Sequence, residues 1–230
     1  MQESGVIPIL FRDERLIAVD KPGGVLVHRT AQANDSTAVL QQVRDQIGQR
    51  IYPVHRLDRA ASGVLLFGLD SEAAAAAHRA LAEPTTEKLY LVLVRGSTAE
   101  RFESRRPLHS ESGRAQEAWT EFRRLAELER CSLLEARLHT GRRHQIRRHL
   151  AHLAHQVIGD TRYGKGRINQ SLRETHGLPR LFLHARGLRL RHPLDPASGE
   201  LRIESPLAAD LDDFLRRLAG SGTPEVDPKG

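Results

Sequence analysis

Residues 54–66 read VHRLDRAASGVLL and join a charged cluster to an apolar run. Asp58 lies between Arg56 and Arg59, and residues 64–69 are apolar apart from one glycine. A short apolar run of this kind is typical of a buried strand, so we expect the charges to lie at the mouth of a strand. A surface ion pair ahead of a strand is the plainer interpretation of one aspartate between two arginines.

A second basic block follows at residues 141–149, which read GRRHQIRRH. We expect a helix over 143–154. At about 100° per residue its core side would carry Ile146, Leu150, Leu153 and Ala154, and its polar side His144, Arg148, His152 and His155. Arg147 lies at the edge of the apolar stripe, from which it can reach a cleft. A solvated basic face is the plainer interpretation of the other cations.

An ordered set of motifs extends these two blocks over most of the chain: 20–24 (DKPGG), 55–58 (HRLD), 62–63 (SG), 88–90 (KLY), 94–96 (VRG), 140–142 (TGR), 144–147 (HQIR), 158–160 (IGD), 163–164 (YG) and 183–185 (LHA). Together they resemble the RluA-type pseudouridine synthases, which isomerise uridine to pseudouridine in RNA. Residues 43–49 (VRDQIGQ) and 147–153 (RRHLAHL) are most similar to the members that modify uridine 65 of tRNA.

The resemblance implies an α+β architecture with a mixed or antiparallel central sheet, flanking helices and an RNA-binding cleft. It implies one catalytic domain over residues 1–219, built from two closely joined halves. The segment ahead of the first motif is too short for a separate small RNA-binding domain of the S4 type, so we expect none. Residues 220–230 are rich in glycine, proline and charge, and we expect them to be disordered.

The chemistry of this isomerisation explains the catalytic residues that the resemblance implies. A carboxylate must attack the nucleoside or stabilise the cationic sugar, and no redox equivalent, phosphate donor, metal or other cofactor is required. Burial alone would raise the pKa of that carboxylate, so a fixed cation must lie beside it, and arginine stays charged when desolvated. By resemblance, Asp58 is the catalytic aspartate and Arg147 is its partner.

Further roles also come from the resemblance. Tyr90 stacks on the target base, and its hydroxyl or a water removes the C5 proton; an ordinary core tyrosine is the alternative. Arg56 enters the space that the flipped uridine vacates, unless it is only a structural partner of Asp58. His55 is a structural or RNA-contacting histidine. The remaining RNA-binding residues that we expect are Arg142, His144 and Arg148.

Composition sets broader bounds. The 230 residues include 35 Lys plus Arg against 29 Asp plus Glu, and this basic balance suits an RNA partner. Cys131 is the only cysteine, so no intramolecular disulfide can form. No apolar stretch reaches the roughly 18 residues of a spanning helix, and no signal-peptide pattern begins the chain. We therefore expect a cytoplasmic monomer that does not bind membranes.

Local patterns predict the secondary structure. We expect strands at 16–20, 64–69, 88–95, 117–124, 131–139, 181–192 and 200–204, of which 88–95 is buried on both faces. We expect helices at 40–47, 72–82, 143–154 and 207–219. One of residues 35–37 would cap the first helix and Gly48 would end it; Ser71 would cap the second and Pro84 would terminate it.

Other functions remain open at this point. The histidines at 144, 149, 152 and 155 suggest a zinc hydrolase, but the flanking arginines would repel a divalent cation, so we expect no metal. A synthase acting on ribosomal RNA, or a catalytically idle RNA-binding protein, would share the motifs. Ala61 stands where relatives commonly have threonine, and Ala154 and Gln156 where they have glycine and proline. These departures remove no group that the reaction needs.

Overall fold

A computed structural model of the chain describes residues 6–28 and 38–220. The chain divides into two compact units, each built from two segments. The first unit comprises Met1–Lys88 and Ala185–Pro206, and the second comprises Leu89–His184 and Leu207–Gly230. Residues 35–37 and nearly all of the expected disordered tail lie outside the described residues. The predicted cap is nevertheless wrong, because the first helix begins at Val39 with Ala38 as its N-cap and has no side-chain capping bond.

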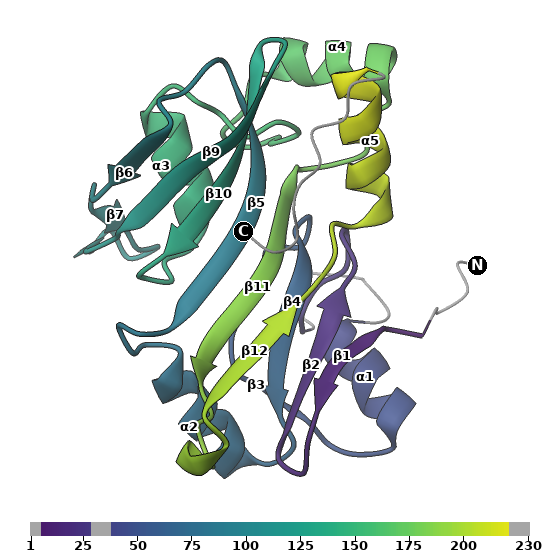
Figure 1. The fold of residues 1–230 in the computed structure, drawn as a ribbon, viewed down its shortest axis with the longest axis vertical. Helices are drawn as coiled ribbons and strands as arrows, with labels where there is room; N and C mark the ends of the chain where they lie inside the picture. Colours follow the sequence, from purple (N-terminus) through teal and green to yellow (C-terminus); the bar gives the residue numbers. More distant parts are fainter. Residues whose placement is uncertain (1–5, 29–37, 221–230) are drawn as a thin grey trace. The chain divides into compact units, whose positions relative to one another are not determined.

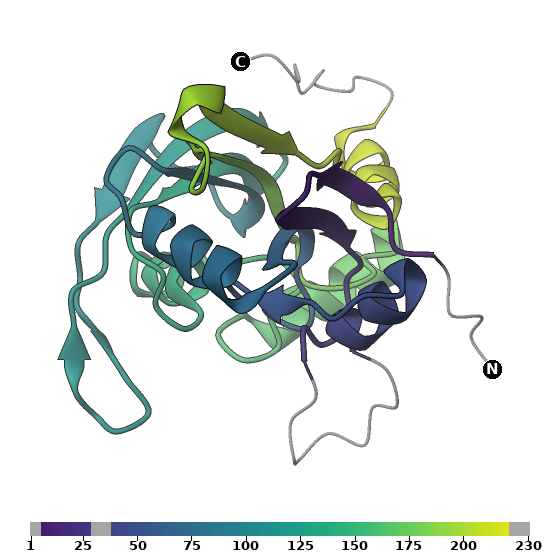
Figure 2. The ribbon, with the colours of Figure 1, turned by 90° about the horizontal axis from the view of Figure 1, so that it is seen from below.

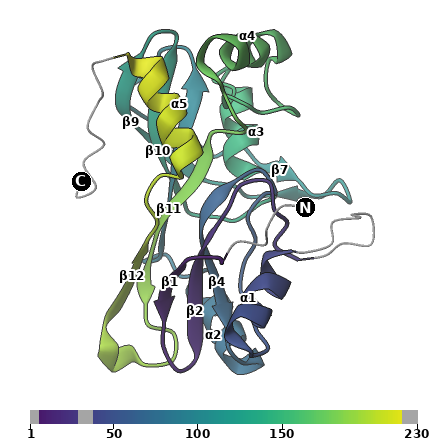
Figure 3. The same cartoon turned by 90° about the vertical axis from the view of Figure 1, so that its right-hand side faces the viewer.

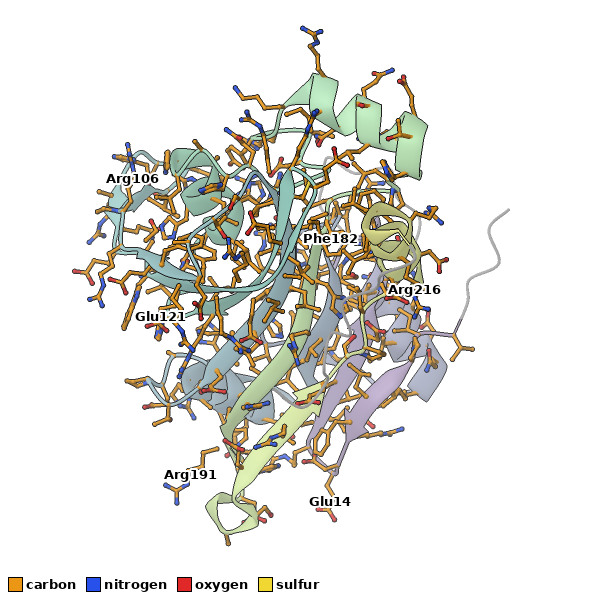
Figure 4. All side chains as sticks on the ribbon, turned by 45° about the horizontal axis from the view of Figure 1, so that its top comes forward. Glu14, Arg106, Glu121, Phe182, Arg191 and Arg216 are labelled. Carbon is orange, nitrogen blue, oxygen red and sulfur yellow. The ribbon has the colours of Figure 1, made fainter. Side chains whose placement is uncertain are left out.

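The first unit is built on a sheet with the strand order β1-β2-β4-β11, in which β12 pairs with β11 and β3 pairs with β4 (Figure 1). The strands are β1 (Ile9–Arg12), β2 (Leu16–Lys21), β3 (Tyr52–Pro53), β4 (Ser62–Gly68), β11 (Leu183–Arg191) and β12 (Glu200–Glu204). All seven residues of β4 are buried, as its apolar run predicts. Glu14, between β1 and β2, and Arg191, the last residue of β11, project outward from this unit (Figure 4).

Two helices belong to the first unit, α1 (Val39–Ile47) and α2 (Ser71–Ala80), with a short 3₁₀ turn at Pro196–Ser198. Gly48 ends α1 in the left-handed conformation, as predicted. The cap of α2 differs from the prediction: it is Asp70, whose side chain accepts a hydrogen bond from the backbone of Ala73, and Ser71 is already helical. Helix α2 also ends at Ala80, before Pro84.

Small residues let α2 approach β4 closely. The helix buries four alanines, and a Cβ added to Gly68 would lie 2.5 Å from the backbone nitrogen of Ala74. The small alanine side chains therefore let the helix backbone pack directly against the backbone of β4. The rest of this core comes from the sheet, including Leu66, Leu188 and Ile203.

The second unit has the strand order β5-β10-β9-β6. Its strands are β5 (Glu87–Arg95), β6 (Arg101–Ser104), β9 (Thr120–Leu128) and β10 (Cys131–Leu138), and β7 (Leu108–His109) pairs separately with β8 (Ala115–Gln116). The last two form a hairpin that extends away from the rest of this unit (Figure 2). Residues 91–94 of β5 are buried, as the two-sided apolar pattern predicts.

Three helices complete the second unit: α3 (Gln145–His152), α4 (Gly166–His176) and α5 (Ala209–Ala219). Figure 3 shows α4 beside α5, and the two helices are in contact. Helix α3 is shorter than predicted, because the chain turns into the left-handed conformation at Ala154. Leu153 is therefore 39% exposed and does not join the core, in contrast to our expectation.

The core of the second unit lies between the sheet and α5, where Leu93, Phe182 and Phe214 meet. The predicted α+β class is confirmed, although α4 was not predicted. None of the described helices is long and apolar enough to cross a membrane.

Candidate functional site

Hydrogen bonds hold the segment that carries Asp58 against the turn after β2. The fully buried side chain of Lys21 donates hydrogen bonds from Nζ to the carbonyl oxygens of Pro22, Arg59 and Ala61, at 2.8, 3.1 and 2.7 Å. Gly24 and Arg59 bond reciprocally: the backbone N–H of Gly24 donates to the Arg59 carbonyl at 2.8 Å, and Arg59 Nε donates to the Gly24 carbonyl at 2.9 Å. Lys21 thus joins the turn after β2 to the backbone that directly follows the aspartate. The sequence suggested only a turn here.

Asp58 itself is partly buried, and Arg56 is exposed two residues earlier. The Asp58 carbonyl accepts the backbone N–H of Ala61 at 3.0 Å, which closes a tight turn before β4. Gly63 follows with a φ of +105°, and a Cβ there would lie 2.2 Å from the carbonyl oxygen of Ala185. Only glycine fits at that point, so the chain is held to one path from the charged cluster into the strand.

His55 faces the interior of the first unit. Its Nε2 accepts the backbone N–H of Leu66 at 3.0 Å. Burial, together with the positive charge of Lys88, lowers the pKa of His55 to about 4. The imidazole is therefore neutral at pH 7 and accepts a hydrogen bond within the first unit. Its contact with RNA stays a prediction.

In the second unit, Tyr90 lies on β5 opposite Ala136 of β10 and is partly buried. Two residues before it, Lys88 donates from Nζ to the carbonyl oxygen of Leu81 at 2.9 Å, just after the end of α2. Burial lowers the pKa of Lys88. The KLY motif therefore combines a lysine that anchors the start of β5 with a tyrosine on the strand.

Arg147 projects from α3 and is 8% exposed. In the second unit it pairs with Asp160: Nε donates to Oδ2 at 2.7 Å and Nη2 donates to Oδ1 at 2.9 Å. Burial raises the pKa of Asp160, but the Arg147 guanidinium and the backbone N–H groups of Tyr163 and Arg162 more than offset it and hold the pKa below its ordinary value. Both groups are charged at pH 7. This pair was not predicted from the sequence.

His144 takes the position before α3 with a φ of +52°. Its Nδ1 lies 3.0 Å from the hydroxyl of Tyr163, and the two rings meet edge to face. The guanidinium carbon of Arg147 lies 5.2 Å from the centre of the Tyr163 ring. His144, Arg147, Asp160 and Tyr163 therefore form one cluster, drawn from the start of α3 and the loop before α4.

Three other residues of the basic block hold the hairpin of β7 and β8. Arg142 Nε donates to the carbonyl of Glu117 at 2.9 Å, and Arg148 Nη1 donates to the carbonyl of His109 at 3.0 Å. His149 is fully buried, and burial lowers its pKa. Its Nε2 bonds the Arg106 carbonyl at 3.0 Å. A carbonyl only accepts, so the neutral His149 ring carries its proton on Nε2.

These bonds leave the block basic. Backbone carbonyls do not neutralise a guanidinium, so Arg142 and Arg148 keep their full charge beside the hairpin. Arg106 adds an exposed cation on the hairpin itself, and Figure 4 labels it at the edge of the second unit. The combination of exposed arginines and a projecting hairpin suits a polyanionic partner.

The predicted residues divide between the units. His55, Arg56 and Asp58 belong to the first, whereas Tyr90, Arg142, His144, Arg147 and Arg148 belong to the second. The structure brings His144 and Arg147 together through Tyr163. Across residues 6–28 and 38–220, no three side chains among His, Cys, Asp and Glu converge in a way that could hold a metal ion.

Comparison with known proteins places the chain in a family. Residues 15–152 match the family model described as RNA pseudouridylate synthase. The chain is similar to proteins named tRNA pseudouridine synthase C. The one from Haemophilus ducreyi is 42% identical over 209 residues, which are 81% of this chain and 86% of the relative. The one from Vibrio vulnificus is 39% identical over 222 residues, which are 86% and 91%.

Solved structures agree on the fold. Human RNA Pseudouridylate Synthase Domain Containing 1 superposes with a TM-score of 0.74 at 25% identity, over 93% of this chain and 90% of that one. Human RNA Pseudouridylate Synthase Domain Containing 4 gives a TM-score of 0.76 at 23% identity, over 92% of each chain. The chain belongs to the RNA pseudouridylate synthase family, and the predicted resemblance and fold are confirmed.

Proposed function

We propose that this protein isomerises uridine to pseudouridine in tRNA, at the position equivalent to uridine 65. The observation that carries the substrate is the similarity to proteins named tRNA pseudouridine synthase C, which covers more than four fifths of this chain and of each of those two relatives. The product contains the same atoms as the substrate: the N1–C1′ bond breaks, a C5–C1′ bond forms, and the C5 proton is replaced by one on N1.

Asp58 is the proposed nucleophile, which attacks the nucleoside or stabilises the cationic sugar. The hydrogen bonds of Lys21 to the flanking carbonyls support this role, because a nucleophile must be held near its attack geometry. The partial burial of Asp58 also supports it, since a carboxylate that fewer waters surround is a stronger nucleophile.

Arg147 and Tyr90 are the proposed partners of Asp58 in the second unit. Arg147 would keep the nucleophile ionised, and its bidentate bond to a buried carboxylate supports a guanidinium held in one orientation. Tyr90 would stack on the target base, and its hydroxyl or a water would take the proton from C5. Its place two residues after the anchored Lys88 supports a fixed ring.

The other predicted residues have proposed roles in RNA binding. The exposed Arg56 would fill the space left by the flipped uridine and offset part of an unstacking cost of a few kcal/mol. Arg142 and Arg148 would contact phosphates while they hold the β7–β8 hairpin. His144, fixed by Tyr163, would contact RNA near Arg147.

Carbodiimide-based mapping of pseudouridine tests the proposal, applied to tRNA and ribosomal RNA from cells with and without the gene. We expect one tRNA site to be lost and to be restored by the wild type and by the surface control Asp45→Asn, but not by Asp58→Asn. Loss of a ribosomal site would keep the reaction and replace the substrate. If no site is lost and the purified protein is inactive on both RNAs, the protein is an RNA-binding protein without this activity.

The proposal also covers the cellular compartment and the oligomeric state in which the protein acts. A tRNA substrate supports action in the cytoplasm, which fractionation of a tagged protein would test. We also propose that the protein acts as a monomer; light scattering of the purified protein, alone and with tRNA, measures this directly.

A further inference from the structure

Asp160 is a buried carboxylate whose two oxygens are both engaged. Its side chain is 0% exposed. Oδ1 accepts the backbone N–H groups of Arg162 and Tyr163 at 2.8 and 2.9 Å and also Nη2 of Arg147. Oδ2 accepts Nε of Arg147 at 2.7 Å. The carboxylate therefore cannot turn without breaking several bonds at once.

The backbone of Asp160 is fixed as firmly as its side chain. Buried Asn169 of α4 accepts the N–H of Gly159 at 2.9 Å and donates to the Asp160 carbonyl at 3.0 Å. A Cβ on Gly159 would lie 2.1 Å from the Arg180 carbonyl oxygen, and one on Gly164 would lie 2.1 Å from that of Asp160. The loop before α4 therefore has one tightly packed conformation, and α4 is the element that locks it.

Tyr163 constrains Arg147 from a second direction. Its ring lies 5.2 Å from the guanidinium carbon, and its hydroxyl is held by His144, which precedes α3. The bidentate bond to Asp160 fixes the guanidinium within its plane, while the ring limits movement out of it. An arginine side chain has several freely rotating bonds, and this arrangement removes most of that freedom.

The arrangement is more than fold stability requires. A buried ion pair carries a desolvation penalty that apolar side chains of similar volume would avoid. The second unit contains a second pair of the same form, in which Arg180 Nε and Nη2 bond Oδ2 and Oδ1 of Asp210 at 2.6 and 2.9 Å, but there the carboxylate is 43% exposed. Of these two arginine–aspartate pairs, only the one at Asp160 has a fully buried carboxylate.

We propose that Asp160 is a positioning residue for the isomerisation and acts through Arg147. It holds the Nε–Nη2 edge of the guanidinium, so the opposite edge, which carries Nη1, has one fixed direction for the reaction. This inference rests on the proposed function and extends it to a residue in the loop before α4. Asp160 does not touch the substrate.

The test compares Asp160→Asn with Asp210→Asn, which breaks a pair of matching geometry away from Arg147. Single-turnover rates on a tRNA transcript are measured with excess enzyme, alongside the Kd for the RNA and the melting temperature. We expect Asp160→Asn to lower the rate by about 100-fold, the loss that a misplacement of about 1 Å costs, with little change in Kd. Asp210→Asn should keep the wild-type rate.

Two readouts separate positioning from a purely structural role. In an Arg147→Lys background, where no bidentate bond can form, adding Asp160→Asn should change the rate little, because the two residues act as a unit. In the single Asp160→Asn variant, the acid limb of the pH–rate profile should move to higher pH, since a displaced cation stabilises the nucleophile's charge less. Asp210→Asn should leave that limb in place.

Several outcomes would overturn the inference. They are a wild-type rate for Asp160→Asn, a rate loss that matches an equal loss of RNA affinity or of folded protein, and an unmoved acid limb. If the asparagine variant does not fold, Asp160→Glu keeps the charge, displaces it by one methylene and carries the same expectations. A wild-type protein that is inactive on tRNA and ribosomal RNA would refute the proposed function itself, whatever the variants do.

Discussion

Replacing Lys21 by methionine tests how the loop that carries Asp58 is held. The substitution keeps the length of the side chain and removes the ammonium that donates to Pro22, Arg59 and Ala61. Hydrogen bonds to a charged group contribute about 1.5–3 kcal/mol each, so three give roughly 5–9 kcal/mol. Removing the charge also removes a burial cost of several kcal/mol. We expect a net destabilisation of about 3 kcal/mol.

Calorimetry measures this loss as a shift in melting temperature. For a chain of this size about 1 kcal/mol corresponds to roughly 3 °C, so the transition of the first unit should fall by about 9 °C. The control is Lys165→Met on an exposed lysine, where a surface change stays within about 0.5 kcal/mol. If Lys21→Met melts with the control, the three hydrogen bonds do not stabilise the loop and the reasoning is wrong.

Three further variants probe other features. His55→Gln keeps an acceptor for Leu66 but cannot titrate. The pKa of His55 is about 4 in the folded protein and 6.5 in the unfolded chain. Between pH 4 and pH 6.5 the unfolded chain therefore binds more protons than the folded protein. Wild-type stability should therefore fall from pH 6.5 to pH 4 by about 3 kcal/mol more than that of the variant in denaturant titrations, and equal slopes would contradict the assignment. In Gly159→Ala the added methyl group would clash with the Arg180 backbone, so the substitution should lower the free energy of unfolding by about 3 kcal/mol. Gly113→Ala has a similar φ but open space around it and should lower that free energy by about 1 kcal/mol. Equal losses by calorimetry would exclude the steric argument. Arg148→Ala should weaken tRNA binding and reduce the slope of log K against log salt by about 1, and an unchanged slope would place Arg148 outside the RNA footprint.

The elements with strong periodicity were predictable from the sequence. The apolar run of β4, the two-sided β5 and the glycine stop of α1 each follow from a local rule that the structure obeys. Helix α4 was not predicted because Ile168 and Leu172 are its only apolar side chains, which are too few to form a clear apolar stripe. The cap of α2 was misplaced by one residue because Asp70 and Ser71 can both accept the capping bond, and only the backbone angles distinguish them.

The residues of the candidate site also divide into those that the sequence predicted and those that it did not. Asp58 and Arg147 are candidates because their motifs resemble those of a family, and their roles stay predictions. Asp160 and Lys21 belong to the same motifs, yet their roles depend on which atoms they meet in three dimensions. A lysine before proline and glycine says nothing about burial, and an aspartate 13 residues from an arginine says nothing about pairing. Long-range partners of this kind require coordinates.

The order in which the chain crosses between its units has a consequence for synthesis on the ribosome. Strand β4 ends at Gly68, but its sheet neighbour β11 begins only at Leu183. At about 5–20 residues per second, a separation of about 115 residues corresponds to a wait on the order of 6–23 s. Throughout that interval the part of β4 that β3 does not pair has an open edge, which is a template for pairing with other chains. Until residues 185–206 emerge, a nascent chain of this protein therefore exposes a strand edge at which aggregation can begin.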